Sequence, residues 1–202
     1  MAPLQHRDPG PRIPSRGRCF VYVAPCAWED LLKLGHSRDP LQRLQALHPR
    51  WYEFFDLERG LLVETDTVRE ARDLELALGR GIALHNAPVP LVIRREAAGH
   101  GEWYRGAGEG LAAAVAELQA RGWPVHAPLR PWLQAALQAR GDLLFSWTQA
   151  MLTPDDFDAP RCDTPLQRTV RDALDAFPAL GLPLAPLLPE RVAAWHRAVS
   201  GR

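Results

Sequence analysis

The stretch from Cys19 to Leu47 constrains the fold of this chain more than any other, because it predicts a strand, a short connection, a second strand and a helix in direct succession. Residues 20–24 are a run of aromatic and β-branched residues, and a second apolar run covers residues 31–36. The six-residue connection between them suits an antiparallel pair. Asp39 then fits the N-cap of a helix whose first residue is Pro40.

Three polar side chains lie in or beside these apolar elements. Tyr22 and Lys33 belong to the two expected strands, and Arg43 sits at the edge of the apolar stripe of the expected helix. That stripe has the three- and four-residue spacing of one helix face. It consists of Leu41, Leu44 and Leu47.

A third strand is expected over residues 51–64, WYEFFDLERGLLVE, where apolar and polar residues partly alternate around a turn or bulge at Arg59-Gly60. Two paired strands alone would be marginal, so the third would complete a small sheet. The predicted fold class is α+β, with a three-stranded antiparallel sheet flanked by helices.

The next helix is expected to be capped at Asp66-Thr67 and to run to about Leu84. On a helical wheel, Glu75 falls inside its apolar cluster, whereas the other acidic residues of the helix fall on the polar side. An ionised carboxylate facing a core is costly unless it is paired or bound to a metal. Glu75 is therefore the clearest physical indication of a site in the sequence.

The domain organisation is predicted from composition and from the proline and glycine residues that separate the expected elements. Residues 1–17 are rich in proline, glycine and arginine and are interpreted as a flexible N-terminal arm. Residues 18–123 form the α/β domain and include an alanine-rich helix before Gly122. Residues 124–202 are expected to be an all-helical extension that packs on the core or meets a partner. Its expected helices are Pro131–Ala139, Leu143–Leu152, Pro165–Phe177 and Pro189–Val199.

Composition excludes several classes of protein. The formal net charge is zero, from 24 basic and 24 acidic residues, so a nucleic-acid binder would need a local basic cleft. No apolar run reaches the roughly 18 residues of a membrane span, and the first residues lack a secretory signal, so we expect no membrane contact and a cytoplasmic location. Three cysteines without C-x-x-C spacing indicate neither a disulfide framework nor a zinc site.

The sequence resembles the GIY-YIG nuclease superfamily in four motifs that follow one another in order. These are Phe20-Val21-Tyr22, Lys33-Leu34-Gly35, Arg43 eight residues after that glycine, and Glu75 followed by the run Gly101–Tyr104. The likeness covers residues 18–106, about half of the chain. It is similar to the branch in which lysine replaces the second tyrosine, so a mechanism that uses two tyrosines is not expected.

The resemblance implies roles for the residues that carry it. Tyr22 would take or relay the proton of an attacking water, and Lys33 would donate to that hydroxyl or to a phosphate oxygen. Arg43 would clamp the phosphate. The competing interpretations are a core tyrosine, a solvent-facing strand lysine and a surface helix arginine. Lys33 is the only lysine in the chain.

Glu75 would hold one divalent cation, Mg²⁺ or Mn²⁺ as its substitute, and the competing interpretation is a buried ion pair with Arg43 or another arginine. His36 matches a histidine of some superfamily restriction enzymes and would assist proton transfer. Glu102 and Trp103 are interpreted as packing and rim residues.

The expected function is therefore a metal-dependent endonuclease that hydrolyses DNA, single- or double-stranded. The first alternative is an inactive module of the same fold that binds nucleic acid or protein in a DNA-processing or phage-defence assembly. A third is a structural or dimerisation protein that self-associates through its tryptophan-bearing C-terminal helices.

Overall fold

The sheet of this α+β protein contains five strands in the order β4-β2-β1-β3-β5, and every neighbouring pair is antiparallel. The strands are β1 (Cys19–Pro25), β2 (Leu31–Ser37), β3 (Leu61–Thr65), β4 (Trp103–Arg105) and β5 (Val125–His126). The structure is a computed structural model that describes residues 18–93, 97 and 101–200. The expected N-terminal arm, residues 1–17, lies outside the described residues.

The expectation of three strands was too low. β1, β2 and β3 form the centre of the sheet, and β4 and β5 extend its two edges. β4 has three residues and β5 has two, so neither is long enough to show an alternating pattern. They are strands because their backbones pair with β2 and β3, which local sequence does not reveal.

The chain divides into two units, Met1–Arg130 and Pro131–Arg202. The first unit thus extends past the boundary expected at residue 124. It does so because β5 pairs with β3, and because the Leu129 and Arg130 amides donate to the carbonyls of Gly60 and Leu57, at 2.8 and 3.1 Å.

The segment expected as one long third strand is a short helix, a turn and a strand. α2 (Trp51–Phe54) is closed by amides at 54 and 55 that donate to the carbonyls of Arg50 and Trp51. The Asp56 carboxylate then accepts from the amides of residues 58 and 59, which makes the turn into β3. The aromatic run is buried against the sheet as a helical turn, and burial rather than alternation explains its composition.

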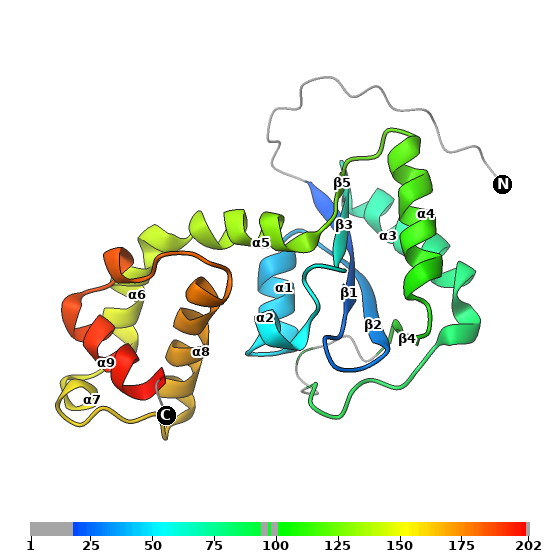
Figure 1. Ribbon diagram of the computed structural model, residues 1–202. Coiled ribbons are helices and arrows are strands. Elements are labelled where there is room, and N and C mark those ends of the chain that lie inside the picture. The colour runs from blue at the N-terminus through cyan, green and yellow to red at the C-terminus, as the bar shows by residue number, and fades with distance from the viewer. Residues whose placement is uncertain (1–17, 94–96, 98–100, 201–202) are drawn as a thin grey trace. The chain divides into compact units, whose positions relative to one another are not determined.

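Helices cover both faces of this sheet. α3 (Val68–Gly81) and α4 (Gly108–Ala120) lie on one side, and α1 (Pro40–Leu47) and α2 lie on the other (Figure 1). Since successive strand residues face opposite sides, Val21 and Val23 pack with α3 and α4, and Tyr22 faces α1. Both predicted N-caps, Asp39 and Thr67, accept a hydrogen bond from the third residue of their helix.

Every secondary-structure element in the described part of the second unit is a helix or a 3₁₀ turn, and no strand occurs there. α5 (Leu129–Gln138) begins with the last two residues of the first unit, and the helices after it are α6 (Leu144–Met151), α7 (Pro154–Asp158), α8 (Pro165–Ala179) and α9 (Glu190–Ser200). The four expected helices are present, and the short α7 lies between the second and the third of them. No helix in the described part of the chain has the length and apolarity needed to cross a membrane.

Candidate functional site

Tyr22 lies in the middle of the sheet, directly opposite Gly35 of the neighbouring strand. Only 1% of its surface is exposed. A Cβ atom placed on Gly35 would lie 2.4 Å from the Tyr22 Oη and 2.5 Å from its Cζ, so the ring covers the glycine backbone. Glycine at position 35 therefore provides the space in which the tyrosine side chain lies.

Arg43 extends from α1 to the hydroxyl of this tyrosine. Its Nε donates to the Tyr22 Oη at 3.3 Å, and its Nη1 donates to the carbonyl of Ala97 at 2.6 Å. The cap at Asp39 and the apolar stripe of α1 fix the rotation of the helix, which turns Arg43 toward the sheet. The guanidinium thus joins β1 to the chain segment that precedes β4.

Lys33 is buried, contrary to the interpretation as a solvent-facing lysine. Its side chain is 1% exposed, and Nζ donates to the carbonyl of Gly101 at 2.8 Å and to Glu102 Oε2 at 2.9 Å. Nζ also lies 6.0 Å from the centre of the Trp103 ring. Because Lys33 is paired with Ala24 of β1, it faces the same side of the sheet as Tyr22.

His36 and Glu75 form a second pair, on the side of the sheet that faces α3. His36 Nδ1 lies 2.5 Å from Glu75 Oε2, and the side chains are 31% and 13% exposed. The competing interpretation of Glu75 was an ion pair with an arginine, and the partner in the structure is a histidine instead. The structure therefore separates the five predicted residues into a Tyr22–Lys33–Arg43 group and a His36–Glu75 pair.

The electrostatics keep the Tyr22 hydroxyl protonated at neutral pH. Burial raises its pKa most, and the hydrogen bond from Arg43 opposes the rise. The negative charges of Glu75 and Glu102 raise this pKa further, so Glu75 acts on Tyr22 although it belongs to the other face. In this environment the Tyr22 oxygen accepts a hydrogen bond from Arg43 and keeps its own proton, so the phenol is not suited to act as a base.

Burial also lowers the pKa of Lys33, and the hydrogen bond and charge of Glu102 are the largest effects that oppose it. Arg43 adds to the lowering, and Glu75 opposes it. The charge state of the amine thus depends on a residue that the sequence indicated only as part of the rim.

Glu75 could supply one carboxylate ligand to a divalent cation. Among residues 18–93, 97 and 101–200, no three histidine, cysteine or acidic side chains are grouped as ligands. Mg²⁺ commonly takes one or two carboxylates and completes its shell with water and substrate phosphate. Glu75, partly exposed, fits that kind of site, in which the substrate supplies ligands.

Sequence analysis did not identify Glu102 as a hydrogen-bond acceptor of Lys33. It also did not identify the two carbonyl groups that accept hydrogen bonds from Arg43 and Lys33. The signal available for Glu102 was its place in the Gly101–Tyr104 run. Nothing in the sequence indicates that the carbonyls of Ala97 and Gly101 accept from Arg43 and Lys33, because those contacts depend on where the chain passes in space.

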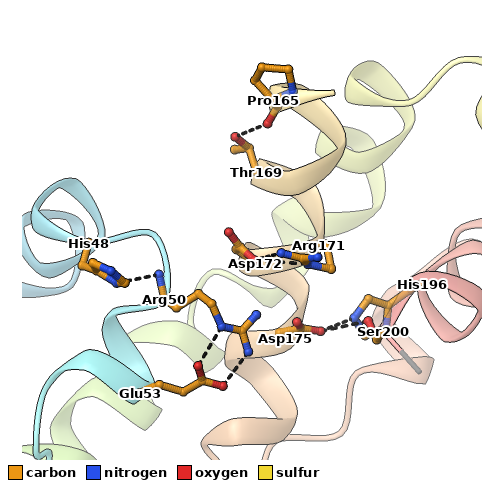
Figure 2. A network of polar contacts seen from close by, with 10 residues as sticks. All are labelled: His48, Arg50, Glu53, Pro165, Thr169, Arg171, Asp172, Asp175, His196 and Ser200. Atoms are coloured by element: carbon orange, nitrogen blue, oxygen red, sulfur yellow. Dashed lines mark hydrogen bonds and ion pairs between the residues drawn. The ribbon is translucent and has the colours of Figure 1, made fainter. Parts of the chain in front are cut away.

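Polar contacts elsewhere serve to hold elements together. In the second unit, Asp175 of α8 accepts from His196 Nε2 at 2.7 Å and from Ser200 Oγ at 3.1 Å (Figure 2). Both donors converge on the carboxylate, which links α8 to α9 and differs from the serine-to-histidine contact of a nucleophile. In the first unit, Arg50 and Glu53 pair at the start of α2 (Figure 2).

In comparisons with known proteins, no family model, curated protein or solved structure matches this chain.

Proposed function

We propose that this chain is a metal-dependent phosphodiesterase that hydrolyses DNA through a GIY-YIG-like core. The observation that carries the proposal is the group formed by Tyr22, Lys33 and Arg43. These polar side chains come from β1, β2 and α1, and they meet on one face of the sheet, where Arg43 hydrogen-bonds to Tyr22. Two cations beside a hydroxyl are suited to a phosphate whose charge increases during hydrolysis.

Arg43 binds and orients the phosphate in this proposal. A guanidinium presents donors in a fixed fork that matches a phosphate, and one of these donors is directed at the carbonyl oxygen of Ala97. A phosphate oxygen is a charged acceptor and forms a stronger bond with Arg43 than that carbonyl does. Substrate binding is thus an exchange of one oxygen acceptor for another.

Tyr22 and Lys33 act beside that phosphate. The Tyr22 oxygen accepts from Arg43, so its own proton remains for donation to a phosphate oxygen. Its raised pKa supports donation and disfavours the expected role as a base. Lys33 contributes positive charge in a buried environment, where charge interactions are stronger than in water.

Glu75 would hold the cation, which when bound stabilises the leaving oxygen. In the neutral tautomer whose Nδ1–H donates to Glu75 Oε2, the Nε2 of the His36 imidazole would be the acceptor for a proton of the attacking water. The carboxylate therefore orients the histidine in the way that a general base requires.

The alternative is a module that binds nucleic acid or protein without cutting. Two observations favour it. Tyr22 and Lys33 are each 1% exposed, and Arg43 already binds a carbonyl. The His36–Glu75 pair also faces the opposite side of the sheet from Tyr22. A substrate phosphate reaches the tyrosine only after the contacts of Ala97 are exchanged. If the chain is a binding module, its binding to DNA or to a partner should be unchanged when divalent cations are removed.

The deciding experiment measures cleavage of labelled single- and double-stranded DNA with Mg²⁺ or Mn²⁺. EDTA, Glu75→Ala and Tyr22→Phe should each lower the rate by about 100-fold or more, which corresponds to about 3 kcal/mol of transition-state stabilisation. Asp73→Ala, an exposed acidic position on the same helix, is the matched control and should cut normally. DNA binding without cleavage would favour the binding module over the nuclease. Cleavage that survives Glu75→Ala would show that Glu75 is not the metal ligand.

A further inference from the structure

Glu102 has an unusual backbone for a residue with a side chain. Its φ is 55°, in the left-handed region, where residues other than glycine are uncommon. This conformation directs the carbonyl of Gly101 and the carboxylate of Glu102 to the same Lys33 ammonium group. Backbone strain of this kind persists where surrounding contacts fix it, and it clusters at functional sites.

The backbone of Glu102 is fixed beside the lysine as well. Its carbonyl accepts from the amide of Leu34, the residue after Lys33, at 3.1 Å. Its side chain is 49% exposed, whereas that of Lys33 is 1% exposed. Glu102 therefore lies between the buried amine and solvent, held by β2 on one side and by the amine on the other.

Two of the three N–H donors of the Lys33 amine form hydrogen bonds. An ammonium group has three N–H donors, and Gly101 and Glu102 accept two of them. Among the described residues, the third has no hydrogen-bonding acceptor. A carboxylate that fixes two of the donors also restricts the orientation of the third.

We propose that Glu102 is the positioning residue of Lys33, which keeps the buried amine charged and oriented so that its remaining N–H is available to a phosphate oxygen of the substrate. This inference deepens the proposed function and rests on it for the identity of the substrate. The effect of Glu102 on Lys33 can be measured without any substrate.

The charged groups that act on Lys33 are Glu102 before β4, Arg43 on α1 and Glu75 on α3, and the neutral but titratable Tyr22 hydroxyl on β1 faces the same side of the sheet. Burial and Arg43 lower the pKa of the amine, and Glu102 is the largest influence that raises it. Glutamine at position 102 would keep a hydrogen-bonding side chain but remove its charge. The amine would then lose its proton at a lower pH than in the wild type.

The first test is an NMR titration of the full chain labelled with [¹³Cε]lysine. Because Lys33 is the only lysine, the spectrum contains one lysine signal. In Glu102→Gln we expect its midpoint to fall by about one pH unit or more, the effect of removing an opposite charge at hydrogen-bond distance. Glu29→Gln, an exposed partner of Arg105, is the matched control and should leave the midpoint unchanged. An unchanged midpoint in Glu102→Gln, or an equal fall in Glu29→Gln, would overturn the proposal.

The second test is the pH profile of DNA cleavage. In Glu102→Gln the alkaline limb of kcat should move to lower pH, and the rate should approach that of the wild type in acid, where Lys33 is protonated in both. Glu102→Asp keeps the charge and should restore part of the alkaline rate. An equal loss at every pH would show a structural role and overturn the proposal. If the wild type cuts no DNA, the proposed function fails, and the titration alone decides the role of Glu102.

Discussion

Replacement of Gly35 by alanine tests the position of the Tyr22 ring directly. The new Cβ would lie 2.4 Å from Oη, 2.5 Å from Cζ and 3.1 Å from Cε1 of that ring. Ordinary contacts between carbon atoms are 3.5–4.0 Å, so the ring must move by roughly 1 Å. The tyrosine is 1% exposed and its hydroxyl accepts from Arg43 Nε, so the surrounding side chains must move with the ring.

The expected cost follows from these distances. Overpacking of a close-packed core costs about 1–3 kcal/mol. Alanine also restricts the backbone of the unfolded chain, which stabilises the folded state and offsets about 0.4–1 kcal/mol of the overpacking cost. Gly35→Ala should therefore lower the free energy of unfolding of the first unit by about 1–2 kcal/mol, which is a factor of about 5–30 in the opening equilibrium.

Hydrogen exchange of the β1 and β2 amides is the assay, because it reports the first unit separately from the second. Gly110→Ala is the matched control: it lies in α4 with no atom within 4 Å of its added Cβ, so it should slow exchange of that helix or leave it unchanged. In a Tyr22→Leu background the cost of Gly35→Ala should fall by about 1 kcal/mol or more. Equal costs in the two backgrounds would refute the ring position.

Three other changes follow from the same geometry. Arg43→Lys should lower DNA cleavage about 10- to 100-fold, since one ammonium group cannot reproduce the two separate donors that contact Tyr22 and the facing carbonyl, and normal rates would contradict the clamp role. Burial raises the pKa of the Cys26 thiol to about 12, so iodoacetamide at pH 8 should modify the more exposed Cys162 first. Cys26 should react only as the pH rises or the chain unfolds, and mass spectrometry of peptides gives the order of modification. Thr164→Ala should remove the capping box of α8 and cost about 1 kcal/mol, seen as faster amide exchange in that helix.

Much of the fold could be predicted where the signal is local. The pairing of residues 20–24 with 31–36 and the helix after Asp39 follow from β-branched runs and a capping residue, and the structure contains both. The aromatic run at residues 51–55 was misinterpreted, because partial alternation also fits a short buried helix. β4 and β5 could not be predicted, since pairing with a distant strand defines them.

The site was predictable to a similar degree. Tyr22 and Lys33 were distinguished by being polar among apolar strand residues, and both are buried in the structure. The wheel position of Glu75 indicated a carboxylate at the edge of the core, and its histidine partner lies 39 residues earlier in the sequence. Nothing local indicates such a pairing. The local sequence also gives no indication of the left-handed backbone that directs Glu102 to the lysine.

Burial of the tyrosine and the lysine is compatible with both an enzyme and a binding module. Among the described residues, Arg43 and Lys33 donate to the Tyr22 hydroxyl, to the carbonyl oxygens of residues 97 and 101 and to one carboxylate oxygen of residue 102. Two cations that already bind oxygen atoms have lost much of their hydration, so exchange for phosphate oxygens avoids most of the desolvation that a solvated pair would undergo. The net cost is that of moving the residues that supply those acceptors. Cations preorganised in this way suit both catalysis and tight phosphate binding, and dependence of the reaction on a divalent cation distinguishes the two.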